Sequence, residues 1–170
     1  HWGVQPDLIQ YAKAITSGYF PLGGIGISDE IADLMTAEGK PWMHAYTYSA
    51  HPVGCAIALA MLDLVEREDF VGMAASKGHR LLNGLNAALG DHPNVGDIRG
   101  LGLMCGIEIV KDRETKDEFP AGDSIGPRVH AACVERGMFS RVRGDVFCLA
   151  PPIVSTEAEL DEMVSILSDS

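Results

Sequence analysis

A single lysine, Lys13, lies among small and apolar residues near the start of the chain. Its neighbours are Ala12, Ala14 and Ile15, so the adjacent sequence provides no carboxylate partner. Burial without a partner disfavours an ammonium and can lower a lysine pKa by about 3–5 units. A neutral amine attacks carbonyl carbons and forms imines. The residue types therefore indicate a Schiff-base lysine, and the alternative is a lysine whose charged head reaches solvent.

Short motifs surround this lysine in a fixed order. They are Gln5-Pro6-Asp7-Leu8, Ala12-Lys13-Ala14, Ser17-Gly18-Tyr19 and Pro21-Leu22-Gly23-Gly24. In order and spacing they resemble the cofactor-lysine signature of class III aminotransferases, which are pyridoxal 5'-phosphate (PLP) enzymes of fold type I. The resemblance implies that Lys13 forms the internal aldimine with PLP. It also implies that Lys13 carries a proton once substrate has displaced it.

Length and charge set broad limits. The chain has 170 residues, 46% hydrophobic and 22% charged, as is usual for a globular protein. It begins at His1 and is shorter than members of this family, so we expect it to be the later part of a subunit. The net charge of −11 argues against nucleic acid or an anionic membrane as a partner. No apolar run is long enough to span a bilayer.

The cysteines are widely separated and lie among apolar residues. Their spacing does not match a metal site. We expect buried, reduced thiols, which are typical of a cytoplasmic protein. The four positions are Cys55, Cys105, Cys133 and Cys148.

Periodicity and turn residues predict an α/β protein of two parts, with the boundary near residue 75. Thr156 and Glu159 form a capping box before the last helix. The resemblance implies that residues 1–75 end a large PLP-binding domain with a mainly parallel sheet. Residues 76–170 would then form a small C-terminal α+β domain. Helices are predicted over 28–36 with Ser28 as N-cap, 52–68, 73–89, 125–136 and from 156 onward; strands are predicted over 25–27, 95–99, 101–110, 139–141 and 146–149. The strand 25–27 and the helix 52–68 are expected to be buried.

A polar, aromatic loop over residues 44–52 precedes the second helix. From the residues alone, the hydroxyl of Thr47 caps that helix. The resemblance instead matches Thr47 with the family threonine that binds the PLP phosphate from the neighbouring subunit. It implies a homodimer, or a tetramer of dimers, with the active site at the subunit interface. His44 and His51 lack a carboxylate at a fitting spacing, so we interpret them as hydrogen-bonding residues rather than metal ligands.

Arginines near the end of the chain are candidates for binding a substrate carboxylate, because a guanidinium binds carboxylates bidentately. Arg141 and Arg143 precede a predicted turn at Gly144-Asp145. Arg141 matches the arginine of ω-transaminases that binds the acceptor carboxylate. Relatives acting on ornithine or 4-aminobutyrate carry an arginine where this chain has Cys148, which favours the amine:pyruvate branch. The alternative is that both arginines are surface charges that offset an acidic protein.

Two aromatic residues, Tyr19 and Trp42, are candidates for the substrate pocket, and core packing is the alternative for both. The resemblance implies that the aspartate facing the pyridine nitrogen and the glycine-serine phosphate loop lie outside this chain. We therefore predict transfer of an amino group from an amine or ω-amino acid to an α-keto acid such as pyruvate. The alternatives are an aminomutase or racemase on the same scaffold, or a non-catalytic homologue.

Overall fold

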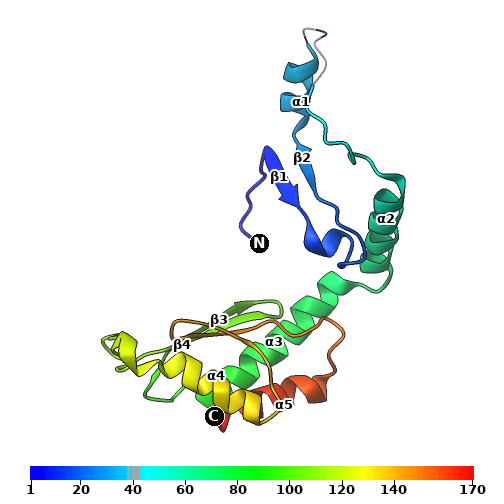
Figure 1. Cartoon of the computed structure of the whole chain (residues 1–170). Coiled ribbons are helices and arrows are strands. Elements are labelled where there is room, and N and C mark those ends of the chain that lie inside the picture. Colours follow the sequence, from blue (N-terminus) through cyan, green and yellow to red (C-terminus); the bar gives the residue numbers. More distant parts are fainter. Residues whose placement is uncertain (38, 40–42) are drawn as a thin grey trace. The chain divides into compact units, whose positions relative to one another are not determined.

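The computed structural model describes residues 1–37, 39 and 43–170 (Figure 1). The chain divides into two compact units, His1–Glu68 and Asp69–Ser170. The boundary predicted near residue 75 lies within helix α3, Phe70–Leu89, all of which belongs to the second unit. None of the described helices is long and apolar enough to cross a membrane.

The first unit contains a two-stranded antiparallel sheet, formed by β1 (Leu8–Tyr11) and β2 (Gly24–Ile27). A short 3-10 helix, η1 (Lys13–Ile15), lies between them in sequence, and α1 (Asp29–Thr36) and α2 (Pro52–Arg67) follow. The sequence predicted β2 but not β1. The expectation that β2 is buried was wrong for the described chain. Ile25 is 60% exposed, because β2 pairs with β1 alone and none of the described helices of this unit packs extensively on its face.

Helix α2 also differs from the expectation of a helix buried on all sides. Only Gly54 and Ala58 are buried on it, while Val53, Leu59 and Leu62 are exposed. The reason is that α2 packs against η1, which covers one side of the helix. Ser28 does stand at the N-cap position of α1, but its hydroxyl accepts no capping hydrogen bond and is buried without a partner.

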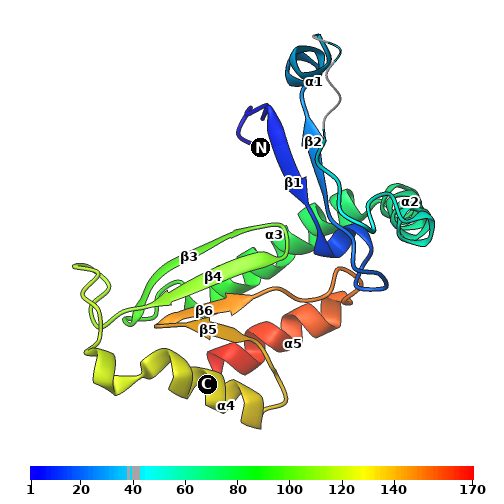
Figure 2. The same ribbon diagram turned by 45° about the horizontal axis from the view of Figure 1, so that its top comes forward.

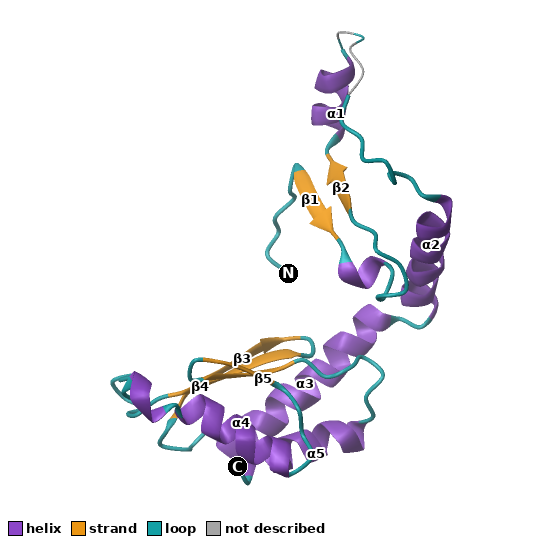
Figure 3. Cartoon of the chain, in the orientation of Figure 1, coloured by secondary structure: helices purple, strands orange, loops and turns teal. Residues whose placement is uncertain are grey.

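The second unit is a four-stranded antiparallel sheet with helices on one face (Figure 2). The strand order is β3-β4-β6-β5. Helices α3, α4 and α5 lie together on the same side of this sheet (Figure 3). The opposite face, which we call the open face, has no helix of this unit upon it. The bounds are β3 Val95–Leu101, β4 Met104–Ile109, η2 Ala121–Asp123, α4 Ile125–Glu135, β5 Arg141–Arg143, β6 Val146–Leu149 and α5 Glu157–Ser168.

The core of the second unit lies between the sheet and these helices. Alternate strand residues such as Ile107 and Phe147 point inward and meet the stripe of Leu81 and Leu85 on α3. Leu160 of α5 completes this layer. The predicted capping box is confirmed, because Glu159 N–H donates to the Thr156 hydroxyl while the Glu159 carboxylate accepts from Thr156 N–H.

Candidate active site

The lysine loop has a strained backbone. Lys13 has φ 54° and Ser17 has φ 49°, values in the left-handed region that side chains other than glycine rarely adopt. Successive tight turns close the loop: Thr16 N–H donates to the Lys13 carbonyl at 3.2 Å, and Tyr19 N–H donates to the Thr16 carbonyl at 3.0 Å. Strain of this kind is concentrated at functional sites, where the surrounding structure holds it.

The amine of Lys13 is exposed in this chain, so the burial expected from its apolar neighbours is not observed. The reason is that Ala12 and Ala14 are themselves exposed and form no pocket around it. Within the described part of the chain, no ion pair or hydrogen bond engages this amine. A primary amine that has lost its proton can bond to an aldehyde carbon, so this unpaired side chain is a candidate for imine formation.

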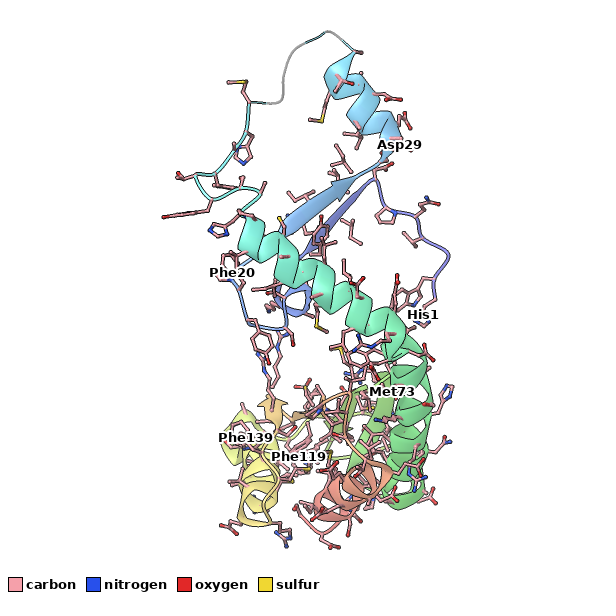
Figure 4. The ribbon with its side chains drawn as sticks, turned by 90° about the vertical axis from the view of Figure 1, so that its right-hand side faces the viewer. His1, Phe20, Asp29, Met73, Phe119 and Phe139 are labelled. Atoms are coloured by element: carbon pink, nitrogen blue, oxygen red, sulfur yellow. The ribbon has the colours of Figure 1, made fainter. Side chains whose placement is uncertain are left out.

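Thr16 fastens this loop, a role that sequence reasoning missed. Its side chain is 2% exposed and its hydroxyl donates to the Phe20 carbonyl at 2.6 Å. The Phe20 ring in turn lies 5.1 Å from the His51 ring and packs directly on Gly54, at the start of α2 (Figure 4). A Cβ at Gly54 would lie 2.8 Å from this ring. The lysine loop is therefore anchored to the beginning of α2.

The Thr47 turn leads into the same helix. Ser49 N–H donates to the Tyr46 carbonyl, and Tyr46 N–H donates to the Ser49 hydroxyl, both at 3.0 Å. Thr47 is exposed and does not cap α2, whose N-cap is His51 without a side-chain bond. Capping, the alternative for Thr47, is therefore not observed, and its hydroxyl is available to a ligand.

The two histidines of this region both lie against aromatic rings. His51 packs its ring against Phe20 and Tyr48, and its buried Nδ1 has no hydrogen-bond partner, so our hydrogen-bonding interpretation of that nitrogen was wrong. The His44 ring lies 5.0 Å from the Tyr46 ring, edge to face. Among residues 1–37, 39 and 43–170, no group of three or more His, Cys, Asp or Glu side chains is placed to hold a metal ion.

A groove of about 780 Å³ brings the lysine and threonine segments together within the first unit. Ala12 lines it on the lysine side, and Tyr46 and Ser49 line it on the Thr47 side. Lys13 and Thr47 are not themselves among the lining residues. Tyr19 is 85% exposed and does not line this groove, and Trp42 lies outside the described residues.

Arg141 lies in the second unit and lines a different groove, of about 830 Å³. It is exposed, and in the described ranges no carboxylate pairs with it or with Arg143, which lines the same groove. By contrast, Arg99 on this groove donates to Asp97 at 2.7 Å and to Glu108 at 3.1 Å. These bonds, chiefly the one to Asp97, raise the pKa of Arg99. Arg141 is therefore an unneutralised cation on a groove.

The first unit has groups that fit two parts of PLP, its aldehyde and its phosphate. Its unpaired amine can bond to the aldehyde carbon, and the exposed Thr47 hydroxyl can donate to a phosphate oxygen. Ala50, with φ 55°, turns the chain toward the α2 N-terminus, an end at which backbone N–H groups favour an anion. A mixed α/β chain with these features is of the class that binds a phosphorylated carbonyl cofactor.

The comparisons with known proteins agree with that class and define it further. The chain belongs to the class III aminotransferases, since the model of "Aminotransferase class-III" matches residues 1–170. PLP is the cofactor of this family, and its fold type I is confirmed for this chain by its solved neighbours.

Individual relatives are transaminases. The chain is 39% identical to a diaminobutyrate–2-oxoglutarate transaminase of Halomonas elongata, over 97% of this chain and 36% of the relative. It is 32% identical to a putrescine–pyruvate aminotransferase of Pseudomonas aeruginosa, over 98% and 36% respectively. An (S)-enantioselective ω-transaminase of Thermomicrobium roseum superimposes with a TM-score of 0.90 at 43% identity, covering 98% of this chain and 37% of that one. The chain thus spans little more than a third of the curated relatives it matches.

Proposed function

We propose that the complete protein is a PLP-dependent aminotransferase that moves an amino group from an amine or ω-amino acid to an α-keto acid such as pyruvate. The observation that carries the proposal is the unpaired Lys13 amine on a strained loop, in a chain that matches the family over residues 1–170. The relatives described above are transaminases, which favours transamination over the aminomutase, racemase and non-catalytic alternatives.

Each candidate site residue is proposed to have one role in transamination. PLP, when bound, supplies an electron sink that stabilises negative charge at the substrate carbon. Lys13 holds the cofactor covalently and then, as a free amine, takes and returns the substrate proton as a general acid–base. Thr47 donates a hydrogen bond to the phosphate, and Arg141 binds the carboxylate of the keto acid through two parallel N–H donors. Tyr19 and Trp42 are proposed to line the substrate pocket.

We also propose a homodimer, or a tetramer of dimers, with the active site at the subunit interface. Support comes from the Thr47 side chain, which is exposed and does not line the groove beside Ala12. Exposed apolar side chains of the first unit, such as Leu59 on α2, also favour burial against another surface. A cytoplasmic location is proposed from the four cysteines, all of which are free thiols.

The test follows the visible absorption of the PLP-loaded complete protein. An amine donor should remove the band of bound PLP, and pyruvate should restore it; recovery without any keto acid would contradict transamination. Borohydride reduction followed by peptide mass spectrometry should place PLP on Lys13. Lys13→Ala should lower the rate by about 10⁴-fold or more, because the covalent anchor and the acid–base group are lost together. Lys111→Ala, an exposed lysine of the second unit, is the matched control and should retain full activity.

A further inference from the structure

The ring of His51, at the N-cap position of α2, lies between the two segments that carry Lys13 and Thr47. Its centroid is 5.1 Å from that of Phe20 in the lysine loop and 6.4 Å from that of Tyr48 in the Thr47 turn. Both separations are within the range of about 4.5–7 Å over which aromatic rings pack. His51 therefore packs with both candidate cofactor segments at once.

On the lysine side, the Phe20 ring is held in place. It packs on Gly54 of α2, where a Cβ would lie 2.8 Å from the ring (Figure 4). The Phe20 carbonyl accepts a hydrogen bond from the Thr16 hydroxyl at 2.6 Å, and Thr16 N–H donates to the Lys13 carbonyl at 3.2 Å. A displacement of Phe20 is therefore transmitted to the backbone of Lys13 through two hydrogen bonds.

On the other side, Tyr48 lies inside a closed turn next to Thr47. Ser49 N–H donates to the Tyr46 carbonyl and Tyr46 N–H donates to the Ser49 hydroxyl, both at 3.0 Å. Ala50 joins this turn to α2 with φ 55°, a left-handed conformation that the surrounding structure must hold. A displacement of the Tyr48 ring therefore changes the position of Thr47.

The imidazole of His51 contributes its ring rather than a hydrogen bond from Nδ1. This nitrogen is buried and has no hydrogen-bond partner in the described part of the chain, and the side chain does not cap α2. Buried polar atoms are usually paired, and asparagine is a better N-cap residue. The contacts of the ring with Phe20 and Tyr48 are therefore what histidine provides at this position.

We propose that His51 couples the two segments, so that phosphate bound at the Thr47 turn raises the affinity of Lys13 for an aldehyde. The physical reason is that a ligand that orders one segment also orders the other, so the second ligand loses less conformational entropy. The aldehyde must then raise the affinity for phosphate by the same factor. His51 is a positioning residue that acts through Phe20 and Tyr48. The coupling lies within one chain, and it rests on the proposed binding of PLP by Lys13 and Thr47.

The test uses the complete protein freed of PLP and divides the cofactor into two probes, pyridoxal for the aldehyde and inorganic phosphate for the anion. Absorption of bound pyridoxal gives its Kd, and borohydride reduction with peptide mass spectrometry places it on Lys13. Saturating phosphate should lower the Kd of pyridoxal by about fivefold or more. A Kd that ignores phosphate would overturn the coupling and leave the proposed function standing. Pyridoxal that does not label Lys13 even with phosphate present would overturn both.

Two substitutions separate the ring of His51 from its nitrogen. His51→Phe keeps an aromatic ring without the unpaired Nδ1 and should retain the phosphate effect. His51→Asn keeps a polar N-cap residue without the ring and should abolish the effect, while the unfolding midpoint is unchanged or higher. Retention of the effect in His51→Asn, or its loss in His51→Phe, would exclude the coupling role of the ring. His79→Ala, at an exposed histidine of α3, is the control and should behave as the parent protein.

A further substitution tests the same contact without changing His51. Gly54→Ala places a Cβ 2.8 Å from the Phe20 ring, so the ring must shift from its position beside His51. Alanine is favoured over glycine within a helix, so α2 should still form. We expect a smaller phosphate effect than in the parent protein. Gly122→Ala, where a Cβ meets nothing within 4 Å, is the matched control. An undiminished phosphate effect in Gly54→Ala would contradict coupling through Phe20.

Discussion

The two units of the chain differ in how they hold their candidate functional residues. In the second unit, Leu85, Phe147 and Leu160 are fully buried, and Arg141 lies on a strand of the sheet that covers this core. Among the described residues of the first unit, few side chains are buried. Thr16 is the most deeply buried of them, and it fastens the loop that carries Lys13. The second unit positions Arg141 through a packed core, whereas the first unit positions Lys13 through hydrogen bonds and a strained backbone.

This difference determines how far the geometry of Lys13 and of Arg141 depends on surfaces outside its own unit. A core of interdigitated side chains defines geometry from within, because each side chain contacts several others. A loop on a two-stranded sheet cannot do so, since an isolated two-stranded sheet is marginally stable in water. The geometry of Lys13 therefore needs further surfaces, whereas that of Arg141 is complete in the second unit.

The largest difference between the units is expected in their ability to fold as separate polypeptides. A polypeptide of residues 69–170 should fold and unfold cooperatively, because its hydrophobic core lies entirely within those residues. A polypeptide of residues 1–68 should not. Circular dichroism during thermal unfolding, together with amide proton dispersion in NMR spectra, measures both. Cooperative unfolding of residues 1–68 alone would show that the first unit is self-sufficient and would remove the contrast.

Core packing in the second unit can be probed with one residue. Leu85→Ala, at a site with no exposed surface, should lower the free energy of unfolding of residues 69–170 by about 2–5 kcal/mol through lost burial and a cavity. Val134→Ala, on α4 and 44% exposed, is the control and should change it by no more than about 0.5 kcal/mol. Urea unfolding measures both values. Similar losses for the two variants would argue against a core centred on α3.

The sequence predicted the helices of the second unit better than it predicted which elements of the first unit are buried. The leucine stripe of α3 and the capping box of α5 are local patterns, and both were confirmed. Burial of β2 and α2 depends on which surfaces meet them, and apolar composition alone does not contain that information. β1 was missed because its four residues, Leu8–Tyr11, lie within the lysine motif and show no alternation.

The site was predicted in part for similar reasons. Lys13 and Thr47 could be named as candidates from the sequence and stay predictions. The anchoring of their segments by Thr16 and Phe20 could not be named, because it depends on the folded backbone. The pairing of Arg141 with Cys148 could have been derived. With a two-residue turn at Gly144-Asp145, the register of the hairpin places these two residues opposite each other.

The hydroxyl of Thr16 should have a moderate effect in the complete protein. Thr16→Val keeps the shape of the side chain but removes the hydrogen bond to the Phe20 carbonyl, leaving that half-buried acceptor without its partner. We expect a loss of about 1 kcal/mol in stability and PLP affinity weaker by about fivefold, because the lysine loop is no longer fastened. Thr16→Ser retains the donor and should restore both. Thermal unfolding and PLP titration measure the effects, and equal behaviour of Val and Ser at this position would exclude the fastening role.

The smallest expected effect is the acid dependence of the second unit. Bonds from the Thr156 backbone and hydroxyl lower the pKa of Glu159, and the Arg80 guanidinium lowers that of Asp161. Both carboxylates therefore stabilise the fold fully above their ordinary pKa values of about 4, and this contribution is lost as pH falls through the lowered folded-state values. Glu159→Gln should flatten the decline in unfolding free energy of residues 69–170 between about pH 5 and pH 2. Glu162→Gln, an exposed carboxylate on the same helix outside the capping box, should leave the decline in place. If the two variants titrate alike, the capping box does not contribute to acid stability, and the acid dependence of this helix comes from other carboxylates such as Asp161, which pairs with Arg80.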